Sequence, residues 1–249
     1  MKRALMGLFT LSLVISSMGC ISGGNDDIEW NIEIYGDISA STTLTYDDIN
    51  ELPQTSIDKK VLNGSENYSG VGLNEVISIA SPGASIDTVN CIADDGYILT
   101  FTLNDFESGL LITRKEGELL GGGSGPVMLG FNIGCACNWM KRVQKIEFFS
   151  REDSLGVIGD VANPVHLTIS DIRDFTGKEN DFTVEELFKK TAYYQQAQTF
   201  TIYTPDSEYN YLIGHMADAI VTYKEGSFNV AIDGMIYEEV ISLDCVWTP

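Results

Sequence analysis

The decisive stretch of this sequence occurs twice: residues 44–52 read LTYDDINEL, and residues 167–175 read LTISDIRDF. A second pair follows in the same order, with LLITRKEG at 110–117 and AIVTYKEG at 219–226. Segments that recur at a similar separation are the sequence signature of a duplicated structural unit. We therefore expect two tandem units, the second a shorter and more diverged copy of the first.

Each copy of this stretch predicts a short helix. Thr45 is an N-cap candidate, because a threonine hydroxyl accepts a hydrogen bond from a free amide of the first helical turn. Asp47 and Asp48 favour that turn through the helix dipole, and Pro53 ends the helix. Residues 168–175 predict the equivalent helix in the second copy.

Runs of β-favouring residues fill much of the remaining chain. Alternation at 29–35 predicts a half-buried strand, and Asp94-Asp95-Gly96 between two apolar runs predicts a hairpin. In the first unit we expect further strands at 56–62, 88–93, 97–103, 110–113, 127–131 and 143–149, a helix at 73–80 and a turn-rich loop at 63–70. In the second unit we expect a helix at 184–191 and strands at 200–204, 209–213, 219–223, 228–232 and 240–246.

This order of elements predicts an α+β fold, a strand-rich mixed sheet with short helices in each of two tandem repeats. The first unit is expected to cover residues 29–150 and the second residues 164–249. Residues 151–163 are expected to form the linker between them.

The first unit resembles a known family in the order of its motifs. A short LT-x-x-D-I helix before Pro53 is followed by Y-x-G-V-x-L-x-x-V at 68–76 and a D-G-Y hairpin at 95–101. The series continues with an L-L strand at 110–117, the Gly125-Pro126 turn and a K-x-x-x-K-I-E-F strand at 141–148. This succession resembles the molybdopterin-binding domain of the sulfite oxidase family, and the resemblance implies that fold.

The resemblance also implies a molybdenum ion held by a pterin dithiolene and a protein cysteine. In the family this cysteine follows the helix that ends at proline, but residues 54–70 read QTSIDKKVLNGSENYSG and contain none. A soft thiolate is the ligand that is hardest to replace. Lys59, Lys60, Lys141 and Arg142 are candidates to bind the pterin phosphate, against the acidic charge of the chain. We therefore expect no cofactor, and molybdopterin is implied by the resemblance alone.

Residues 1–19 have the pattern of a secretory signal peptide. Lys2 and Arg3 precede an apolar run at 5–15, which is short for a membrane span. Small residues then lead to Cys20, and a Gly-rich acidic tether follows to residue 28. This pattern resembles a prokaryotic lipoprotein signal of the archaeal kind, which implies a lipid on Cys20 and a position on the extracytoplasmic face of the cell membrane. An ordinary cleaved signal and an uncleaved anchor are the alternatives.

The excess of acidic over basic residues limits the kinds of molecule that this chain can bind. The 249 residues include 36 acidic and 15 basic ones, for a formal net charge of −21. A chain without a basic patch cannot neutralise phosphates, so nucleic acid is excluded as a partner. The hydrophobic fraction of 44% is sufficient for a substantial core, most simply arranged as two domains.

Four cysteines besides Cys20 are candidates for disulfides or a metal site. Four cysteines in an extracytoplasmic chain allow two disulfides, with three connectivities. Cys91 and Cys245 lie in apolar runs and fit buried free thiols equally well. Cys135 and Cys137 form a C-x-C pair that fits a redox dithiol or half of a soft-metal site, although no second pair completes a zinc set.

Two sequons mark candidate glycosylation sites at Asn63 and Asn67, within the segment that holds the metal ligand in the resembling family. His166 and His215 are the two histidines, which leaves little room for a Ser-His-Asp arrangement. No catalytic constellation stands out in either unit, so whether the chain is an enzyme stays open and a non-catalytic role is favoured.

These observations predict an extracytoplasmic lipoprotein that binds a ligand or protein partner at the cell surface without catalysis. The first alternative is a molybdopterin-dependent oxidoreductase or an accessory redox subunit. The second is a thiol-redox or metal-binding protein that uses Cys135 and Cys137. Tandem units of this size often pack side by side, and a cleft between them is the expected ligand site.

Overall fold

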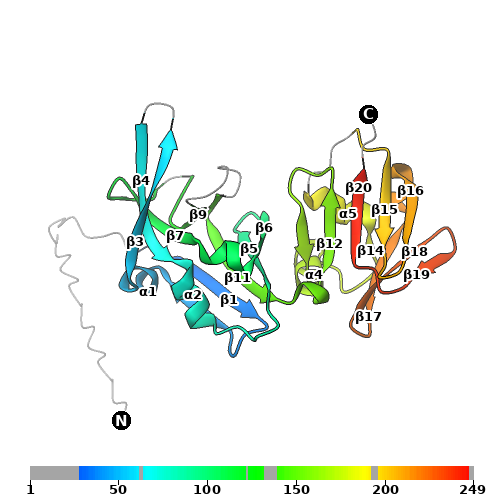
Figure 1. The fold of residues 1–249 in the computed structure, drawn as a ribbon, viewed down its shortest axis with the longest axis horizontal. Coiled ribbons are helices and arrows are strands. Elements are labelled where there is room, and N and C mark those ends of the chain that lie inside the picture. The colour runs from blue at the N-terminus through cyan, green and yellow to red at the C-terminus, as the bar shows by residue number, and fades with distance from the viewer. Residues whose placement is uncertain (1–27, 62–63, 122, 132–138, 192–195, 247–249) are drawn as a thin grey trace, which may run out of the picture.

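The computed structural model describes residues 28–61, 64–121, 123–131, 139–191 and 196–246. Two strand-rich units lie side by side, and the chain passes from the first to the second after β11 (Figure 1). Within the described residues there are four sheets, mixed or antiparallel, and a few short helices, so the α+β class predicted from the sequence is confirmed. No helix in these residues is both long and apolar enough to cross a membrane.

The first unit consists of two sheets with a shared core. The first sheet has the order β2 (Thr42–Thr45), β1 (Asn31–Gly36), β11 (Val143–Phe149), β5 (Thr88–Ala93) and β6 (Ile98–Thr102). The second has the order β10 (Met140–Lys141), β9 (Met128–Phe131), β7 (Gly109–Lys115), β4 (Gly64–Gly72) and β3 (Gln54–Val61), with β8 (Glu118–Leu119) paired to β7. The helices are α1 (Tyr46–Glu51), α2 (Leu73–Ala80) and α3 (Leu103–Glu107). Side chains such as Ile34, Leu111 and Phe148 fill the space between the sheets.

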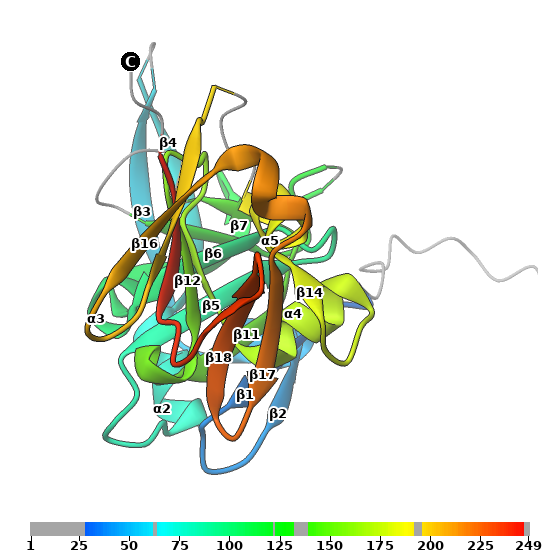
Figure 2. The same ribbon diagram turned by 90° about the vertical axis from the view of Figure 1, so that its right-hand side faces the viewer.

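The second unit also has two sheets. A short 3-10 helix, η2 (Arg151–Asp153), leads into the first sheet, which has the order β13 (Val165–Leu167), β12 (Leu155–Gly159), β20 (Ser242–Val246), β15 (Thr199–Tyr203) and β16 (Glu208–Leu212). The other sheet has the order β14 (Phe182–Thr183), β17 (Ile220–Lys224), β18 (Ser227–Ile232) and β19 (Met235–Tyr237). The helical segments are α4 (Ile169–Thr176), α5 (Val184–Thr191) and the 3-10 helix η3 (Ile213–Ala217) (Figure 2). Its core includes Phe188, Phe200 and Leu243, and Ile98 of β6 joins it from the first unit.

The five-stranded sheets of the two units have the same topology. In each, the first strand of the unit pairs in parallel with the last strand, β1 with β11 and β12 with β20. The last strand then pairs antiparallel with the first strand of a hairpin, β5–β6 or β15–β16. The β3–β4 hairpin of the first unit corresponds to the short β14 in the second. That this correspondence arose by duplication, and the exact domain limits, remain predictions.

A Gly-Asp pair stands at the end of the first strand of each unit, Gly36-Asp37 and Gly159-Asp160. The repeated motifs of the sequence do not include this pair. Gly36 has φ +99° and Gly159 has φ +92°, in the left-handed region where glycine is favoured. A Cβ on either glycine would overlap the backbone oxygen of the neighbouring last strand. The following amide donates to that same oxygen at 2.7 Å in both units: Asp37 to Phe148, and Asp160 to Cys245.

The two repeated LT-x-x-D-I stretches form helices with the same cap. Thr45 caps α1 and Thr168 caps α4, and each accepts a hydrogen bond from the backbone amide of the aspartate three residues later. The aspartates, Asp48 and Asp171, accept in return from the backbone amide of the threonine. Both helices therefore begin with a capping box, which fixes their first turn.

Two sequence predictions are wrong. The turn-rich loop expected at 63–70 belongs largely to strand β4, because this segment pairs along its length with β3 and then with β7. The linker expected at 151–163 contains β12, an inner strand of the second unit between β13 and β20. Both segments contain glycines and polar residues that favour turns locally, and pairing with distant strands overrides that preference.

Replacement of the strand-end glycines tests this topology. Gly36→Ala and Gly159→Ala should each lower the free energy of unfolding by about 3 kcal/mol, because left-handed strain adds to backbone overlap. Gly177→Ala is the matched control, since Gly177 has φ +68° and a methyl group there would meet no atom within 4 Å. It should cost about 1 kcal/mol, from left-handed strain alone. Urea unfolding measures the three values. Equal losses would contradict the close approach of the parallel strands.

Candidate functional site

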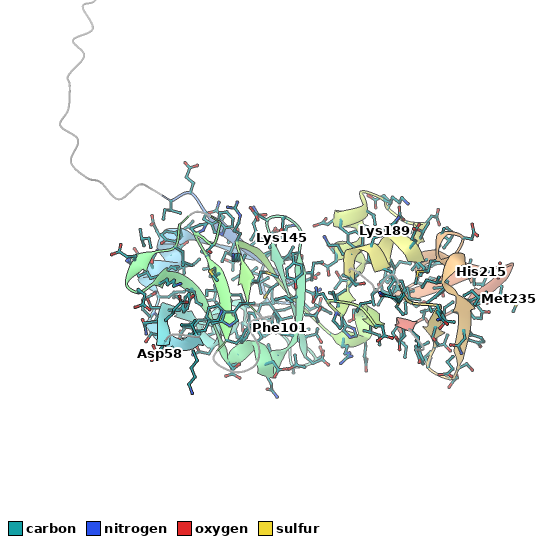
Figure 3. The ribbon with its side chains drawn as sticks, turned by 90° about the horizontal axis from the view of Figure 1, so that it is seen from above. Asp58, Phe101, Lys145, Lys189, His215 and Met235 are labelled. Atoms are coloured by element: carbon teal, nitrogen blue, oxygen red, sulfur yellow. The ribbon has the colours of Figure 1, made fainter. Side chains whose placement is uncertain are left out.

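The second unit covers part of the outward face of the first unit's five-stranded sheet. Strand β13 and the start of α4 lie against β5, β6 and β11, and hydrogen bonds cross between the units. Figure 3 labels Phe101 and Lys145 on the side of the first unit that is nearer to the second. We call this contact the joint, and define it by Asn90, Thr100, Glu147, His166, Thr168 and Asp171.

Asn90 is the central hydrogen-bonding residue of the joint. Its side chain is fully buried on β5. The amide nitrogen donates to the backbone oxygen of His166 at 2.8 Å and to Oδ2 of Asp171 at 2.7 Å. Its amide oxygen accepts from the Thr100 hydroxyl at 2.7 Å, and that hydroxyl accepts from the backbone amide of His166 at 3.0 Å. One side chain thus connects both units.

Two carboxyl groups from different units are buried in the joint. Glu147 on β11 and Asp171 on α4 are each 3% exposed. Oε1 of Glu147 accepts from the Thr168 hydroxyl at 3.0 Å, and Oδ2 of Asp171 accepts from Asn90 and from the backbone amide of Thr168. The other oxygens, Glu147 Oε2 and Asp171 Oδ1, are buried without a hydrogen-bond donor.

Burial changes the acid–base behaviour of the joint. It raises the pKa of Glu147 to about 9, with the nearby charge of Asp171 as the next cause, and it also raises the pKa of Asp171. Burial lowers the pKa of His166 to about 4, so this imidazole is neutral at physiological pH. Burial beside Glu147 raises the pKa of the Tyr35 hydroxyl as well. Burial in the joint therefore disfavours the charged form of each of these groups.

Three hollows open along the joint. The largest, about 700 Å³, lies between β6 and α3 of the first unit and Asn163-Pro164 of the second, and we call it the β6 hollow. A hollow of about 220 Å³ reaches Asp171, and one of about 270 Å³ reaches Glu147. The predicted inter-unit cleft is thus present as separate hollows rather than one groove.

The structure shows two of the cysteine candidates to be free thiols. Cys91 lies on β5 in the first core and Cys245 on β20 in the second. Burial raises the pKa of the Cys91 thiol, and it raises the pKa of Cys245 to about 11. Neither is an activated thiolate. Cys20, Cys135 and Cys137 lie outside the described residues, so their roles remain predictions.

Of the glycosylation candidates, Asn67 is described and Asn63 is not. Asn67 lies on β4 rather than in a loop, and its side-chain amide donates to Asp58 across the β3–β4 hairpin at 2.8 Å. Its backbone amide donates to Glu116 at 2.6 Å. The modifiable nitrogen is therefore already engaged within the strand pair.

The described residues do not fit a molybdenum cofactor. Residues 54–61 and 64–70 form the β3–β4 hairpin without a thiolate, and no three His, Cys, Asp or Glu side chains gather elsewhere in the described chain to hold a metal. Two residues of the expected basic cluster are engaged by other side chains. Lys59 lies over the Trp139 ring at 4.0 Å, whereas Arg142 forms an ion pair with Asp94.

Comparison with known proteins gives likenesses in structure and none in sequence. No protein-family profile matches the chain, and no curated protein matches it in sequence. Among solved structures, the sulfane dehydrogenase SoxCD from Paracoccus pantotrophus is similar, at 11% identity and a TM-score of 0.42 over 83% of this chain and 68% of that one. A likeness of this strength indicates at most a distant relation in fold and carries no argument about activity or cofactor.

Sequence reasoning missed the carboxyl pair of the joint. Glu147 stands in the run IEFF, and a charged residue between buried Ile146 and Phe148 was the available signal. Asp171 resembled an ordinary surface residue of a capping box. Its burial depends on the packing of α4 against another unit, which no local pattern reports.

Removal of the central amide should weaken the joint. Asn90→Ala removes the side-chain donor of the His166 carbonyl and one of the two donors to Asp171 Oδ2, so we expect a loss of about 2–4 kcal/mol of unfolding free energy. Asn210→Ala is the matched control, because Asn210 accepts from Thr201 at 2.6 Å on the equivalent β15–β16 hairpin and is exposed. Chemical unfolding compares the two, and a similar loss in both would show that Asn90 has no special role.

Proposed function

We propose that this chain is a lipid-anchored extracytoplasmic protein that binds a small polar molecule in the β6 hollow, without catalysis. The observation that carries the proposal is the hollow itself. Its volume of about 700 Å³ is within the range of small-molecule sites, and its walls come from both units.

The chemistry of the walls favours an uncharged or cationic ligand. Phe101 and Phe131, core side chains that are 8% and 7% exposed, contribute a small apolar surface, with ring centroids 4.9 Å apart. Asn104 and Ser108 on and after α3 offer an amide and a hydroxyl, and Asp105 is the one acidic group among the lining residues. Those lining residues include no lysine or arginine, so an anion would meet no counter-charge there.

An aromatic surface beside hydroxyl and amide groups suits a carbohydrate or another polyhydroxylated molecule. The C–H face of a sugar ring can pack on the aromatic side chains, while its hydroxyl groups form hydrogen bonds with the polar ones. A polyamine is the cationic counterpart. The net charge of −21 supports this preference, since it repels anions at long range.

Blocking the hollow tests the ligand site. Thermal unfolding is measured with mono- and oligosaccharides, polyamines, sulfate and phosphate. We expect a saccharide or polyamine to raise the melting temperature of the wild type. At a ligand concentration of 100 times its Kd, the free energy of unfolding should rise by about 2.7 kcal/mol. Asn104→Trp should abolish this shift, because Asn104 is exposed at the wall of the hollow.

Asn74→Trp provides the matched control. Asn74 is also an exposed asparagine at the second residue of a short helix, after a leucine, but it does not line the hollow. This variant should keep the full ligand shift. Stabilisation by anions alone, or an unchanged shift in Asn104→Trp, would contradict the proposed site.

The proposed membrane anchor rests on Cys20 and its surrounding sequence. In cell fractionation the wild type should accompany the membrane, and Cys20→Ser should be released or retained as an uncleaved precursor, because the lipid is attached to the thiol. Mass spectrometry of the N-terminal peptide should show a lipid on Cys20. An unmodified Cys20, or a mature chain that starts elsewhere, would contradict a lipoprotein.

A further inference from the structure

Glu147 and Asp171 form a pair in which each carboxyl lacks a donor for one oxygen. Three hydrogen bonds reach the other two oxygens of the pair. The Thr168 hydroxyl donates to Glu147, and the Asn90 side chain and the Thr168 backbone amide donate to Asp171. The orphaned atoms are Glu147 Oε2 and Asp171 Oδ1. An unpaired buried carboxylate oxygen is costly, so each of these oxygens is expected to have a donor. The two carboxyl groups lie within hydrogen-bonding reach of each other, which places the missing donor between them.

No basic side chain supplies that donor among the described residues. Lys145 forms its ion pair with Asp174 at 2.8 Å, and Lys190 lies over the Phe175 ring at 5.4 Å. The ionisable groups that face the pair from the packed elements are Glu33 and Tyr35 on β1, Lys145 on β11, Asp174 on α4, Lys190 on α5 and His166 on β13.

We infer that Glu147 and Asp171 share a single proton, and that this proton-binding site holds the two units together. One carboxyl donates through this proton to the carboxylate of the other, which satisfies both orphaned oxygens with one hydrogen bond. The pair then carries one negative charge instead of two. That charge is stabilised by Asn90, by the Thr168 hydroxyl and by the first turn of α4.

Loss of the proton should open the joint. Deprotonation leaves two carboxylates facing each other in a buried space, and the released proton passes to solvent. The two smaller hollows provide the route, because one reaches Asp171 and the other reaches Glu147. Separation of the units rehydrates both carboxylates. The β6 hollow spans the same joint, so its walls move apart in the open form.

The direction of the pH effect follows from linkage. Burial raises the pKa of both groups in the closed form, Glu147 to about 9, above the ordinary carboxyl value of the open form. The stabilisation of the closed form by the bound proton is therefore fully present at pH values below the ordinary carboxyl pKa, and it declines as the pH rises toward 9. Uptake of one proton on closing changes the closing equilibrium by up to about tenfold per pH unit in that window.

The test compares the wild type with Asp171→Asn and Glu147→Gln between pH 6.5 and 9. An amide at either position donates to the remaining carboxylate at every pH, so the variants should stay closed. For each variant we divide its folding equilibrium constant by that of the wild type at the same pH. We expect this ratio to rise at least tenfold between pH 6.5 and pH 9, because only the wild type loses stability. Small-angle scattering should show an increase in radius of gyration for the wild type alone. This readout needs no ligand.

Asp48→Asn is the matched control, because Asp48 has the same place in the capping box of α1. It is exposed, and the hydrogen bonds that the Thr45 hydroxyl and backbone amide donate to its carboxylate hold its pKa below the usual range. Its substitution should give a constant ratio to the wild type across the same pH range. A constant ratio for Asp171→Asn and Glu147→Gln as well would overturn the shared proton.

A direct titration and a metal test complete the experiment. Carbon-13 NMR of the wild-type carboxyl carbons should show Glu147 and Asp171 releasing their shared proton above pH 6.5. Two titrations below pH 5 would overturn the inference. The metal test adds calcium at pH 9 and a chelator at pH 6.5. If calcium closes the joint of the wild type and the chelator opens it, a metal ion occupies the space between the two carboxyl groups, and the shared proton is overturned.

Discussion

Burial of Glu147 against Asp171 is the constraint on which the arrangement of the two units depends. Each unit has its own hydrophobic core, and Ile98 of β6, with Ile92 of β5 beside it, packs from the first unit against the core of the second. The buried polar part of the contact includes hydrogen bonds donated by Asn90 and Thr168. The contribution of these buried polar groups to the joint depends on whether each of them finds a hydrogen-bond partner.

The two units show how one local motif serves two purposes. Thr45 with Asp48 and Thr168 with Asp171 make the same capping box on helices of similar length. In the first unit the box faces solvent, and the aspartate is a strong acid that stabilises the helix start. In the second unit the box is pressed against β5 and β11, and burial makes the aspartate a weak acid. The same two side chains thus cap a helix in one place and bind a partner surface in the other.

Much of the secondary structure could be predicted from local signals. The helices 73–80 and 184–191 and the strands 88–93 and 143–149 agree with the structure because periodicity, caps and turn residues all favour the same element. Strand β4 was missed because its glycines and serines favour a turn, and distant pairing decides its form. The carboxyl pair was missed for a related reason: its two members are 24 residues apart in sequence and meet only when two finished units dock.

An atomic-resolution crystal structure at pH 6 would test the shared proton most directly. The separation of Glu147 Oε2 and Asp171 Oδ1 should be about 2.5–2.7 Å, the length of an O–H···O⁻ hydrogen bond, with unequal C–O bonds in the carboxyl that carries the proton. A water molecule or metal ion between the two oxygens, or a separation beyond about 3.2 Å, would contradict a shared proton as the link between the units.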